Sequence, residues 1–417
     1  MKLLVISQYF WPENFRINDL VQELVKRDHD VTVLTGQPNY PDGKIFADFK
    51  ARPNDFAEYA GARIVRVPLI PRGDGRGLQL ALNYFSFAVS AAVLGAWKLR
   101  KTPFDKIFVF EPSPITVGVP AAVLRWLRRI PVAFWVLDLW PETLEAVGVV
   151  KSRWLLRLTG VLVSWIYNRC DLILAQSKSF IPQIVRYCRY PDRIVYFASW
   201  AEAVYDLDEV ERAPEVPDQP GAFNIVFAGN IGEAQDFPAI VTAAEKLSDE
   251  RSIRWIIVGD GRMAAWLREE IDRRKLQSSV LMVGRYPIER MPSFYRHADA
   301  LLMSLKPDPI FSMTIPGKLQ SYLAAGIPVL AMIDGEGARL INEAGAGLAC
   351  AAGDSEGLAR EAKKLAAMTQ GEREAMGRKG RDISVTEFDR DTQIDKLEAW
   401  LLGLRYDDHS KVIEAAQ

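Results

Sequence analysis

Residues 224–247 read NIVFAGNIGEAQDFPAIVTAAEKL, which joins an apolar run, a glycine-containing turn and an amphipathic stretch. The run Asn224–Ala228 predicts a buried strand, and Phe237–Leu247 predicts a helix. The same alternation recurs along the whole chain. Continuous apolar strands between helices are typical of parallel sheets covered on both faces. The fold class is therefore α/β, and ligands are expected where the strands end.

Strands are predicted in both halves of the chain. They are Lys2–Ser7, Val31–Thr35, Arg63–Val67, Lys106–Phe110, Val132–Leu137, Asp171–Ala175, Asn224–Ala228, Arg254–Val258, Val280–Val283, Ala300–Ser304 and Pro328–Met332. Helices are predicted between most of them, including Arg16–Arg27, Phe237–Leu247, Met263–Arg274 and Leu319–Ala325. Two such blocks predict two doubly wound, Rossmann-like units.

Length and composition exclude several classes of protein. The chain has 417 residues, 49% hydrophobic and 25% charged, which fits two large globular domains and not a disordered chain or a coiled coil. Its net charge of −1 gives no sign of a nucleic-acid partner. Only 3 Cys and 3 His occur, so a disulfide framework and a Cys/His zinc site are not expected. A cytosolic location follows from this cysteine usage.

The charge is divided unevenly between the two halves. Residues 1–200 carry 26 Lys and Arg against 17 Asp and Glu, and residues 201–417 carry 26 against 36. The stretch Ala201–Gly221 is acidic and contains three prolines, as expected of a linker. Domains with different roles are predicted at 1–200 and 201–385, although chance and a local acidic linker would also produce the asymmetry.

Polar residues follow several strands of the first half. The loop after the first strand lacks the G-x-G-x-x-G pattern of dinucleotide enzymes and carries Glu13, with Arg16 near the next helix start. Asn39, Tyr40 and Glu111 lie in later loops of the same kind. All five are predicted to contact an acceptor, such as a sugar or a lipid-linked phosphate, although packing at the domain edge would explain the first loop equally well.

The sharpest of these loops is DLWPE, residues 138–142, directly after the strand Val132–Leu137. Asp138 and Glu142 are predicted to point into the active site, because a carboxylate just past a buried parallel strand has no structural need to be there. The alternative is that Asp138 caps the following helix.

Glycine-rich loops follow three strands of the second half, and such turns let backbone amides reach a phosphate. Lys318 comes after Pro316-Gly317 in the first turn of a predicted helix, where a cation would stabilise a departing diphosphate. The alternative for Lys318 is a solvated surface position. The predicted donor-binding residues are Gly229, Asn230, Gly232, Gly261, Arg285, Tyr286, Pro316, Gly317, Gln320, Glu336 and Gly337.

Three stretches of the first half combine aliphatic, aromatic and basic residues. They are Phe85–Lys101, Ala121–Arg129 and Lys151–Arg169. Tryptophan on an apolar helical face with arginine opposite is typical of interfacial helices, so contact with an anionic membrane is predicted. The longest uncharged apolar run, Tyr84–Trp97, is too short to span a bilayer. An ordinary amphipathic helix packed in a core remains the alternative.

Taken together, these motifs resemble retaining glycosyltransferases of family four, which have the GT-B fold with two Rossmann-like domains facing each other across a cleft. The segments that carry the resemblance are QPNYPDGKIF, YFSFAVSA, DLWPE, FAGNIGEAQ, VGDG and PGKLQSYLAAGIPVLA followed by DGEGAR. They are most similar to a bacterial subgroup assigned to L-fucosamine and related amino-sugar transfer. The resemblance implies that residues 386–417 begin with a helix, Phe388–Leu404, that returns to the first domain.

The chain departs from the wider family at several positions. Asp138 stands where the family often has His, and Ser312 and Gln320 stand at the two ends of its E-x7-E motif. Asn230 and Gln235 replace an Arg/Lys pair on the pyrophosphate, which leaves that charge to Lys318 and Arg285.

The resemblance implies a reaction that moves a sugar, expected to be an N-acetyl amino sugar, from a nucleotide-sugar donor such as a UDP-sugar. The acceptor would be a polyprenyl-diphosphate-linked sugar of O-antigen, lipopolysaccharide or capsule synthesis at the inner face of the cytoplasmic membrane. No metal or other cofactor is expected. Two alternatives remain: a GT-B type sugar-nucleotide epimerase, and a non-catalytic subunit of a polysaccharide assembly complex.

Overall fold

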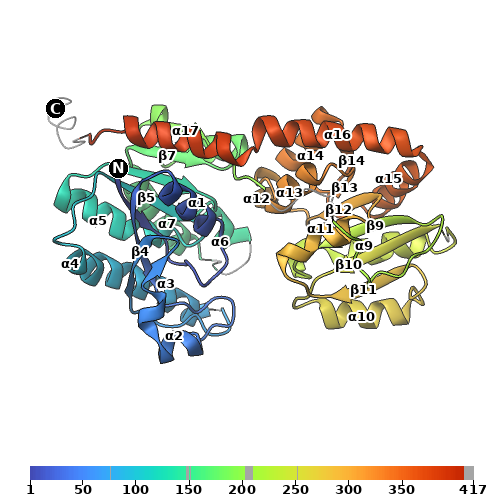
Figure 1. Cartoon of the computed structure of the whole chain (residues 1–417), viewed down its shortest axis with the longest axis horizontal. Coiled ribbons are helices and arrows are strands. Elements are labelled where there is room, and N and C mark those ends of the chain that lie inside the picture. The colour runs from blue at the N-terminus through green and yellow to red at the C-terminus, as the bar shows by residue number, and fades with distance from the viewer. Residues whose placement is uncertain (76, 147–149, 151, 202–209, 251, 408–417) are drawn as a thin grey trace. The chain divides into compact units, whose positions relative to one another are not determined.

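The computed structural model describes residues 1–75, 77–146, 150, 152–201, 210–250 and 252–407. The chain divides into two compact units, and each is described by itself (Figure 1). Unit 1 consists of Met1–Phe197 and the chain from Ile394 onward, and unit 2 consists of Ala198–Gln393. The first part of unit 1 ends near the predicted boundary at residue 200, and the chain belongs to unit 1 again from Ile394 onward.

Unit 1 is built on one sheet, which has eight strands in the described part of the chain, in the order β3-β4-β2-β1-β5-β6-β7-β8. All neighbouring strands are parallel except β3 and β4. The strands are β1 Lys2–Ile6, β2 Asp30–Gly36, β3 Glu58–Tyr59, β4 Ala62–Val67, β5 Lys106–Glu111, β6 Val132–Val136, β7 Leu172–Ala175 and β8 Ile194–Tyr196.

Helices connect these strands. They are α1 Arg16–Lys26, α2 Ala47–Ala51, η1 Pro53–Phe56, α3 Gly77–Ser90, η2 Ala91–Gly95, α4 Ala96–Lys98, η3 Ile115–Val117, α5 Gly118–Arg128, α6 Glu142–Ala146, α7 Arg153–Tyr167, η4 Lys178–Phe180, α8 Ile181–Val185 and η5 Pro191–Arg193. The segments α3, η2 and α4 follow one another without a break, and η2 is a π-helical turn that inserts an extra residue into this helix.

Unit 2 contains a second parallel sheet, six-stranded in the described residues, in the order β11-β10-β9-β12-β13-β14. Its strands are β9 Phe223–Ala228, β10 Ile253–Val258, β11 Val280–Gly284, β12 Ala300–Ser304, β13 Val329–Met332 and β14 Gly347–Cys350. Its helices are η6 Glu233–Gln235, α9 Phe237–Lys246, α10 Ala264–Arg273, η7 Ile288–Arg290, α11 Met291–Tyr295, α12 Pro309–Met313, α13 Gly317–Ala325, α14 Gly335–Ala344, α15 Ser355–Ala367 and α16 Gln370–Glu387.

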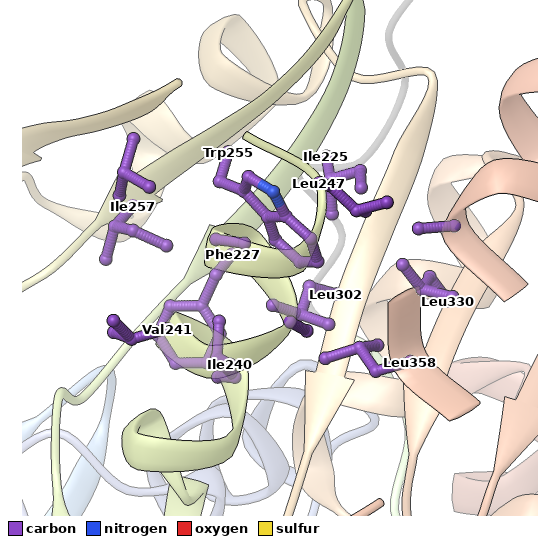
Figure 2. Packing of buried hydrophobic residues seen from close by; sticks show 14 of the residues in the cluster. Ile225, Phe227, Ile240, Val241, Leu247, Trp255, Ile257, Leu302, Leu330 and Leu358 are labelled. Atoms are coloured by element: carbon purple, nitrogen blue, oxygen red, sulfur yellow. The ribbon is translucent and has the colours of Figure 1, made fainter. Parts of the chain in front are cut away.

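One face of this sheet packs against α9, α10 and α15 to form a continuous apolar core (Figure 2). Trp255 and Phe227 come from neighbouring strands and are 1% exposed, and Leu302 and Leu358 are fully enclosed. Phe227 meets Phe237 of α9 edge to face, with ring centroids 5.0 Å apart. The apolar strands predicted from the sequence are thus the buried strands of the sheet.

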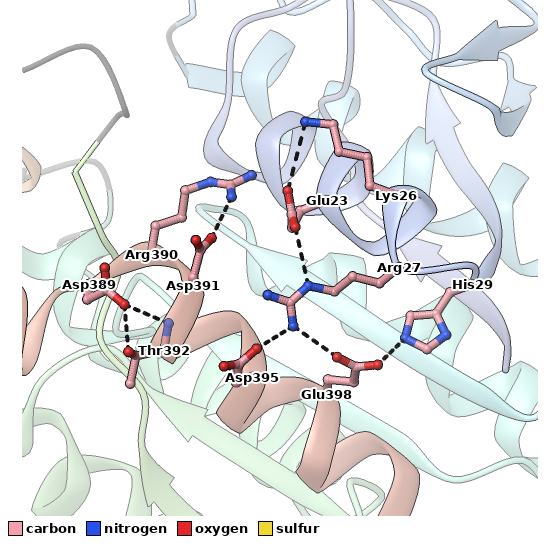
Figure 3. A network of polar contacts seen from close by, with 10 residues as sticks. All are labelled: Glu23, Lys26, Arg27, His29, Asp389, Arg390, Asp391, Thr392, Asp395 and Glu398. Atoms are coloured by element: carbon pink, nitrogen blue, oxygen red, sulfur yellow. Dashed lines mark hydrogen bonds and ion pairs between the residues drawn. The ribbon is translucent and has the colours of Figure 1, made fainter.

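Helix α17, Arg390–Gly403, runs from the end of unit 2 into unit 1. Asp389 precedes its first turn and accepts hydrogen bonds from the backbone and hydroxyl of Thr392 (Figure 3). Within unit 1, Glu398 accepts from Arg27 at 3.0 Å and contacts His29 Nε2 at 2.8 Å (Figure 3). These ion pairs fix the later part of α17 onto unit 1.

Each predicted strand has a counterpart in the structure, with ends shifted by at most one residue. The short strands β3, β8 and β14 are not among the predictions, because two to four residues give too little alternation to recognise. In the acidic linker, residues 202–209 lie outside the described residues. The helix that contains the apolar run of the first half is longer than the sequence indicates: Gly77–Lys98, 22 residues, is long and apolar enough to cross a membrane.

Candidate active site

Each sheet has one position where the strand order reverses, and doubly wound folds bind their ligands there. In unit 1 this position lies between β1 and β5, and in unit 2 it lies between β9 and β12. The loops after β1, β5 and β6 in unit 1 carry most of the predicted acceptor and catalytic residues. The loops after β9 and β12 in unit 2 carry Gly229 and lead to Lys318.

Asp138 lies two residues after β6, and its carboxylate is held by its neighbours. Thr143 Oγ1 donates to Oδ1 at 2.5 Å, and the indole nitrogen of Trp140 donates to Oδ2 at 3.1 Å. Burial raises the pKa of Asp138, while these hydrogen bonds act in the opposite direction. Helix α6 begins only at Glu142, so Asp138 does not occupy the position of its cap. The side chain is half-buried at the carboxyl edge of the sheet.

Glu111 ends β5 and lies behind Asp138. The Glu111 side chain is 0% exposed, and its Oε2 accepts the backbone N–H of Asp138 at 3.4 Å. Burial raises the pKa of Glu111 well above its usual range, and the charge of Asp138 raises it further. A fully enclosed side chain has no direct contact available with an acceptor. The structure therefore contradicts the predicted contact of Glu111 with an acceptor, and places its side chain inside unit 1, where it accepts the Asp138 N–H.

Glu13 and Asn39 are also enclosed, with exposures of 2% and 0%. The Glu13 carboxylate accepts the backbone N–H groups of Asn39 at 2.8 Å, Tyr40 at 2.7 Å and Phe10 at 3.1 Å. Burial raises the pKa of Glu13 to about 7, against the lowering effect of these bonds. Both residues tie the loops after β1 and β2 together, and their predicted contact with an acceptor is corrected for the same reason.

Tyr40 differs from these residues because its ring is 37% exposed. It packs against Tyr9, with centroids 5.5 Å apart, and the guanidinium of Arg72 lies 5.0 Å from its centroid. Arg72 also donates to the Tyr9 hydroxyl at 3.3 Å. An exposed ring beside a cation is a surface on which a sugar can stack. Tyr9 and Arg72 are not among the five predicted acceptor-binding residues, although their loops are also candidate places for an acceptor.

Two further predicted residues of unit 1 are placed at helix starts. Arg16 is the first residue of α1 and is half-buried. Glu142 is the first residue of α6, where its Oε1 accepts from the Tyr187 hydroxyl at 3.2 Å and lies 3.6 Å from Arg186. The other oxygen of Glu142 is buried without a hydrogen-bond partner in the described residues. Glu142 is thus oriented toward α8 and its following residues, while Asp138 is held by Trp140 and Thr143.

Lys318 lies in the first turn of α13 in unit 2. Its ammonium is 3.9 Å from the centroid of the Phe227 ring, and in the described part of the chain it has no recorded ion pair or hydrogen bond. Burial lowers the pKa of Lys318 to about 7. At Gly229, where φ is +136°, an added Cβ would lie 2.4 Å from the Lys318 Cε. Glycine at this turn is what lets the lysine side chain lie against the loop after β9.

The two glycine loops of unit 2 are packed backbone to backbone. Gly259, with φ +148°, would place a Cβ 1.8 Å from the carbonyl oxygen of Gly229, and Gly261 would place one 2.4 Å from that of Ile231. Gly232 is equally close to the Asn230 and Gln235 side chains. These glycines therefore meet a packing requirement, and Asn230 is left exposed at the tip of the loop.

The remaining predicted donor residues fall into enclosed and accessible groups. With its amide nitrogen turned toward the loop, Gln320 donates to the carbonyl oxygens of Pro316 at 3.0 Å and Gly317 at 2.8 Å. Because Gln320 is 2% exposed, its predicted contact with the nucleotide is corrected to a bond within its own helix. Glu336 is 7% exposed and pairs with Arg339 at 2.7 Å, and Gly337 packs close to Pro316.

Gly317 and Arg285 are exposed, and Pro316 and Tyr286 are half-buried. The Tyr286 ring packs against Phe294, with centroids 4.8 Å apart, and the Arg290 guanidinium lies 5.4 Å from its centroid. Arg285 and Tyr286 lie in the loop that follows β11, whereas Pro316 and Gly317 form the start of α13. Among the described residues, no group of three or more His, Cys, Asp or Glu is arranged to hold a metal ion.

Comparison with known proteins agrees with this division of the chain. Residues 14–200 match the glycosyl transferase 4-like domain, and residues 222–368 match glycosyl transferases group 1. WcaI of Escherichia coli strain K12, whose name assigns it to colanic acid biosynthesis, is 25% identical over 78% of this chain and 82% of its own. WbjE of Pseudomonas aeruginosa, named as a glycosyltransferase, is 24% identical over 68% of this chain and 70% of its own.

Solved structures with the same arrangement of elements include a complex with UDP and a glycosyltransferase. Anabaena HepE in complex with UDP has a TM-score of 0.69 and 15% identity, covering 97% of this chain and 100% of its own. WaaG, a glycosyltransferase involved in lipopolysaccharide biosynthesis, has a TM-score of 0.64 and 14% identity, covering 95% of this chain and 98% of its own. These likenesses show the GT-B fold. The chain belongs to the glycosyltransferases, with a glycosyl transferase 4-like first domain and a group 1 second domain.

Proposed function

We propose that this glycosyltransferase retains the anomeric configuration and moves an N-acetyl amino sugar from a UDP-sugar to a polyprenyl-diphosphate-linked acceptor. The reaction would serve bacterial O-antigen, lipopolysaccharide or capsule synthesis at the inner face of the cytoplasmic membrane. The names of WcaI and WaaG support the polysaccharide context, and the complex of HepE with UDP supports a uridine nucleotide. The amino-sugar donor rests on the resemblance of the motifs as a set, DLWPE among them, to the L-fucosamine subgroup.

The observation that carries the proposal is the state of Lys318. A half-buried lysine at the start of a nine-residue helix, with no carboxylate partner among the residues that the structure describes, is costly unless an anion completes the site. The N-terminal turn of a helix favours a phosphate, because its first N–H groups have no partner within the helix. A diphosphate would restore the lysine charge and receive stabilisation as it departs from the sugar.

Asp138 is assigned to position the donor sugar and to polarise the acceptor hydroxyl. In the front-face reaction, the oxygen of that hydroxyl attacks the anomeric carbon while the bond from this carbon to the diphosphate breaks. The hydroxyl proton passes to the departing phosphate oxygen, so no covalent sugar–enzyme bond forms. Thr143 and Trp140 occupy one site on each Asp138 oxygen, which holds the carboxylate in one orientation.

An exposed apolar face of unit 1 supports contact with a membrane. Its side chains, all at least 36% exposed, come from helices that pack against one another: α3 with η2 and α4, α5, and α7. We call this set the apolar face: Leu78, Leu82, Phe85, Val89, Val93, Leu94, Trp97, Trp126, Leu127, Trp154, Leu155, Leu158, Val161 and Trp165. Arg153 and Arg157 are exposed on the same helix, α7.

The arrangement favours a helix lying in the interface over one that crosses the bilayer. Asn83, Phe87 and Ala91 on the other side of the long helix are buried. The side-chain amide of Asn83 donates to Asn39 Oδ1, in the loop after β2, at 3.4 Å. Gly95 lies so close to the Leu34 side chain that a Cβ would be 2.9 Å from it. A helix packed in this way against the sheet has only one face left for lipid.

The proposal is tested by incubating the full-length chain with a panel of UDP-sugars and polyprenyl-diphosphate-linked sugars in vesicles. The expected product is a lipid-linked saccharide longer by one sugar, with the donor's anomeric configuration. Asp138→Asn is expected to reduce kcat about a hundredfold while the thermal midpoint stays within a few degrees. Wild-type rates in Asp138→Asn would refute the role of this carboxylate.

The same assay separates the alternatives. Conversion of the free nucleotide sugar without any acceptor would indicate an epimerase. Binding of the donor without turnover over every acceptor would indicate a non-catalytic subunit.

A further inference from the structure

The carboxyl group of Glu111 is placed directly behind Asp138 by the register of the sheet. Glu111 pairs with Val136 across β5 and β6, and the backbone N–H of Leu137 donates to the Glu111 carbonyl at 3.1 Å. The next N–H along, that of Asp138, reaches the Glu111 side chain. The two carboxyl-bearing residues thus share one hydrogen bond at the point where the strands end.

In the described part of the chain, none of the groups that shift the pKa of Glu111 is a cation that would offset a buried anion. Among the described residues it forms no ion pair, and its Oε1 is enclosed without a hydrogen-bond partner. The titratable groups that face the Glu111–Asp138 pair are Tyr167 of α7, whose hydroxyl is also enclosed without a partner, Glu142 of α6 and Tyr84 of α3. None of these is a cation, and an unpaired buried carboxylate is far more costly than the neutral acid.

Asp138 is the member of the pair that can hold a charge. It is half-buried, and its oxygens accept from a hydroxyl and an indole N–H, whereas Glu111 is fully enclosed. The charge of Asp138 further disfavours the ionised form of Glu111. Burial raises the pKa of both groups, and that of Glu111 lies well above its usual range.

We propose that Glu111 is a positioning residue for Asp138: its neutral carboxyl group holds the Asp138 backbone amide and leaves Asp138 as the ionised member of the pair. The inference rests on the proposed function only for the role of Asp138 in transfer. Glu111 itself touches no substrate. The side-chain Oε2 of Glu111 accepts the Asp138 N–H and so fixes the backbone that carries the Asp138 side chain. Because the Glu111 carboxyl group is neutral, it does not raise the pKa of Asp138 further.

Three variants separate these statements. Glu111→Gln keeps a neutral group with an oxygen that accepts the Asp138 N–H, whereas Glu111→Leu has a similar volume and no acceptor. Glu145→Gln changes an exposed carboxylate on α6 and serves as the matched control. All three are made in the full-length chain.

The first readout is infrared absorption at a pH well above 7, because burial raises the pKa of Glu13 to about 7 and ordinary carboxyl groups ionise at lower pH. The wild type and Glu145→Gln are expected to show the C=O band of a protonated carboxylic acid, and Glu111→Gln is expected to lack it. A wild-type spectrum without this band would overturn the proposal. The second readout is hydrogen exchange of the Asp138 amide, which is expected to stay slow in Glu111→Gln and to become at least about tenfold faster in Glu111→Leu. Equal exchange in the two variants would also overturn it.

The third readout is transfer kinetics. Glu111→Gln is expected to keep kcat within about threefold and to leave the acid limb of the pH dependence of kcat where it is in the wild type. Glu111→Leu is expected to lower kcat about tenfold with an unchanged KM for the nucleotide sugar. A shift of the acid limb to lower pH in Glu111→Gln would mean that Glu111 is ionised and would refute the proposal. If the infrared and exchange results hold but no transfer occurs in the wild type, the proposed function fails and the Glu111–Asp138 pair stands.

Discussion

At the scale of single residues, Lys318 links the sequence to the chemistry most directly. Its position after Pro316-Gly317 identifies it as the cation of a helix start, and the structure adds what the sequence does not contain. The lysine side chain packs against Phe227 and Gly229, which lie much earlier in the sequence. Burial lowers the pKa of Lys318 to about 7. Above about pH 7, a lysine with that pKa gains a proton when an anion binds beside it.

This state of Lys318 predicts a coupling between nucleotide binding and proton uptake. Above about pH 7 the free protein holds a neutral amine, and a bound diphosphate favours the ammonium, so binding takes up a proton. Affinity for UDP is therefore expected to fall as pH rises through this range. Calorimetry in buffers of different ionisation enthalpy measures the number of protons that the protein takes up when it binds UDP. This number should be near zero at low pH and rise toward one per bound nucleotide at high pH.

Two substitutions check the assignment of the proton to Lys318. Lys318→Gln is expected to abolish the uptake and to weaken UDP binding by about 10- to 100-fold, the range of a charge-assisted hydrogen bond. Lys363→Ala removes an exposed lysine that pairs with Glu250 and should change neither quantity. Uptake that persists in Lys318→Gln would assign the proton to another group.

Sequence position identified the loops but not which side chains are reachable from them. Three residues near the predicted loops are at most 2% exposed: Glu111 at the end of β5, Asn39 after β2 and Gln320 in α13. Whether a side chain in such a loop turns outward or inward depends on partners from distant loops, such as Glu13 for the Asn39 backbone. Arg72 shows the converse, because its relation to Tyr9 and Tyr40 is visible only after folding.

At the scale of elements, the central strands of both sheets were predictable and the edges were not. The strands β1, β5 and β6 are buried along nearly their whole length and therefore form unbroken apolar runs. The edge strand β3 has two residues and pairs antiparallel to β4, so it carries no such signal. The extent of the helix Gly77–Lys98 was also underestimated, because polar residues before Tyr84 obscure its start.

The apolar face belongs to this scale, and it predicts vesicle binding through unit 1. Replacing Trp126 and Trp154, which are 76% and 65% exposed, by serine is expected to weaken binding to anionic vesicles at least tenfold. Replacing Arg153 and Arg157 by glutamine is expected to reduce the dependence of binding on salt. Flotation of the full-length chain with vesicles measures both.

Val385→Ser supplies the matched control for this experiment. Val385 is 62% exposed on α16 of unit 2, outside the apolar face. Its substitution should leave flotation unchanged, and none of these exposed substitutions should move the thermal midpoint by more than a few degrees. Equal losses in Val385→Ser and in the tryptophan variant would reject the apolar face as a membrane contact.

At the scale of the whole molecule, the uneven charge and the acidic linker indicated two units, and the structure shows two. The return of the chain to unit 1 through α17 follows from the resemblance and not from composition. In the structure this return is held by Arg27, Glu398 and His29, whose pairing spans most of the sequence (Figure 3). Interactions between residues so far apart leave no local pattern in a single sequence.

The central claim is that the strand ends around Gly229 and Lys318 in unit 2 bind the diphosphate of a nucleotide sugar. The most direct test is thermal unfolding of the wild type and Lys318→Gln with UDP, GDP and TDP and their sugars. At about 100 times the dissociation constant, a ligand adds ~2.7 kcal/mol to the stability of the folded protein. We expect a clear rise in the wild-type midpoint with UDP and its sugars, and at most about half of that rise in Lys318→Gln at the same ligand concentration. No rise with any nucleotide, or an equal rise in both proteins, would contradict the account.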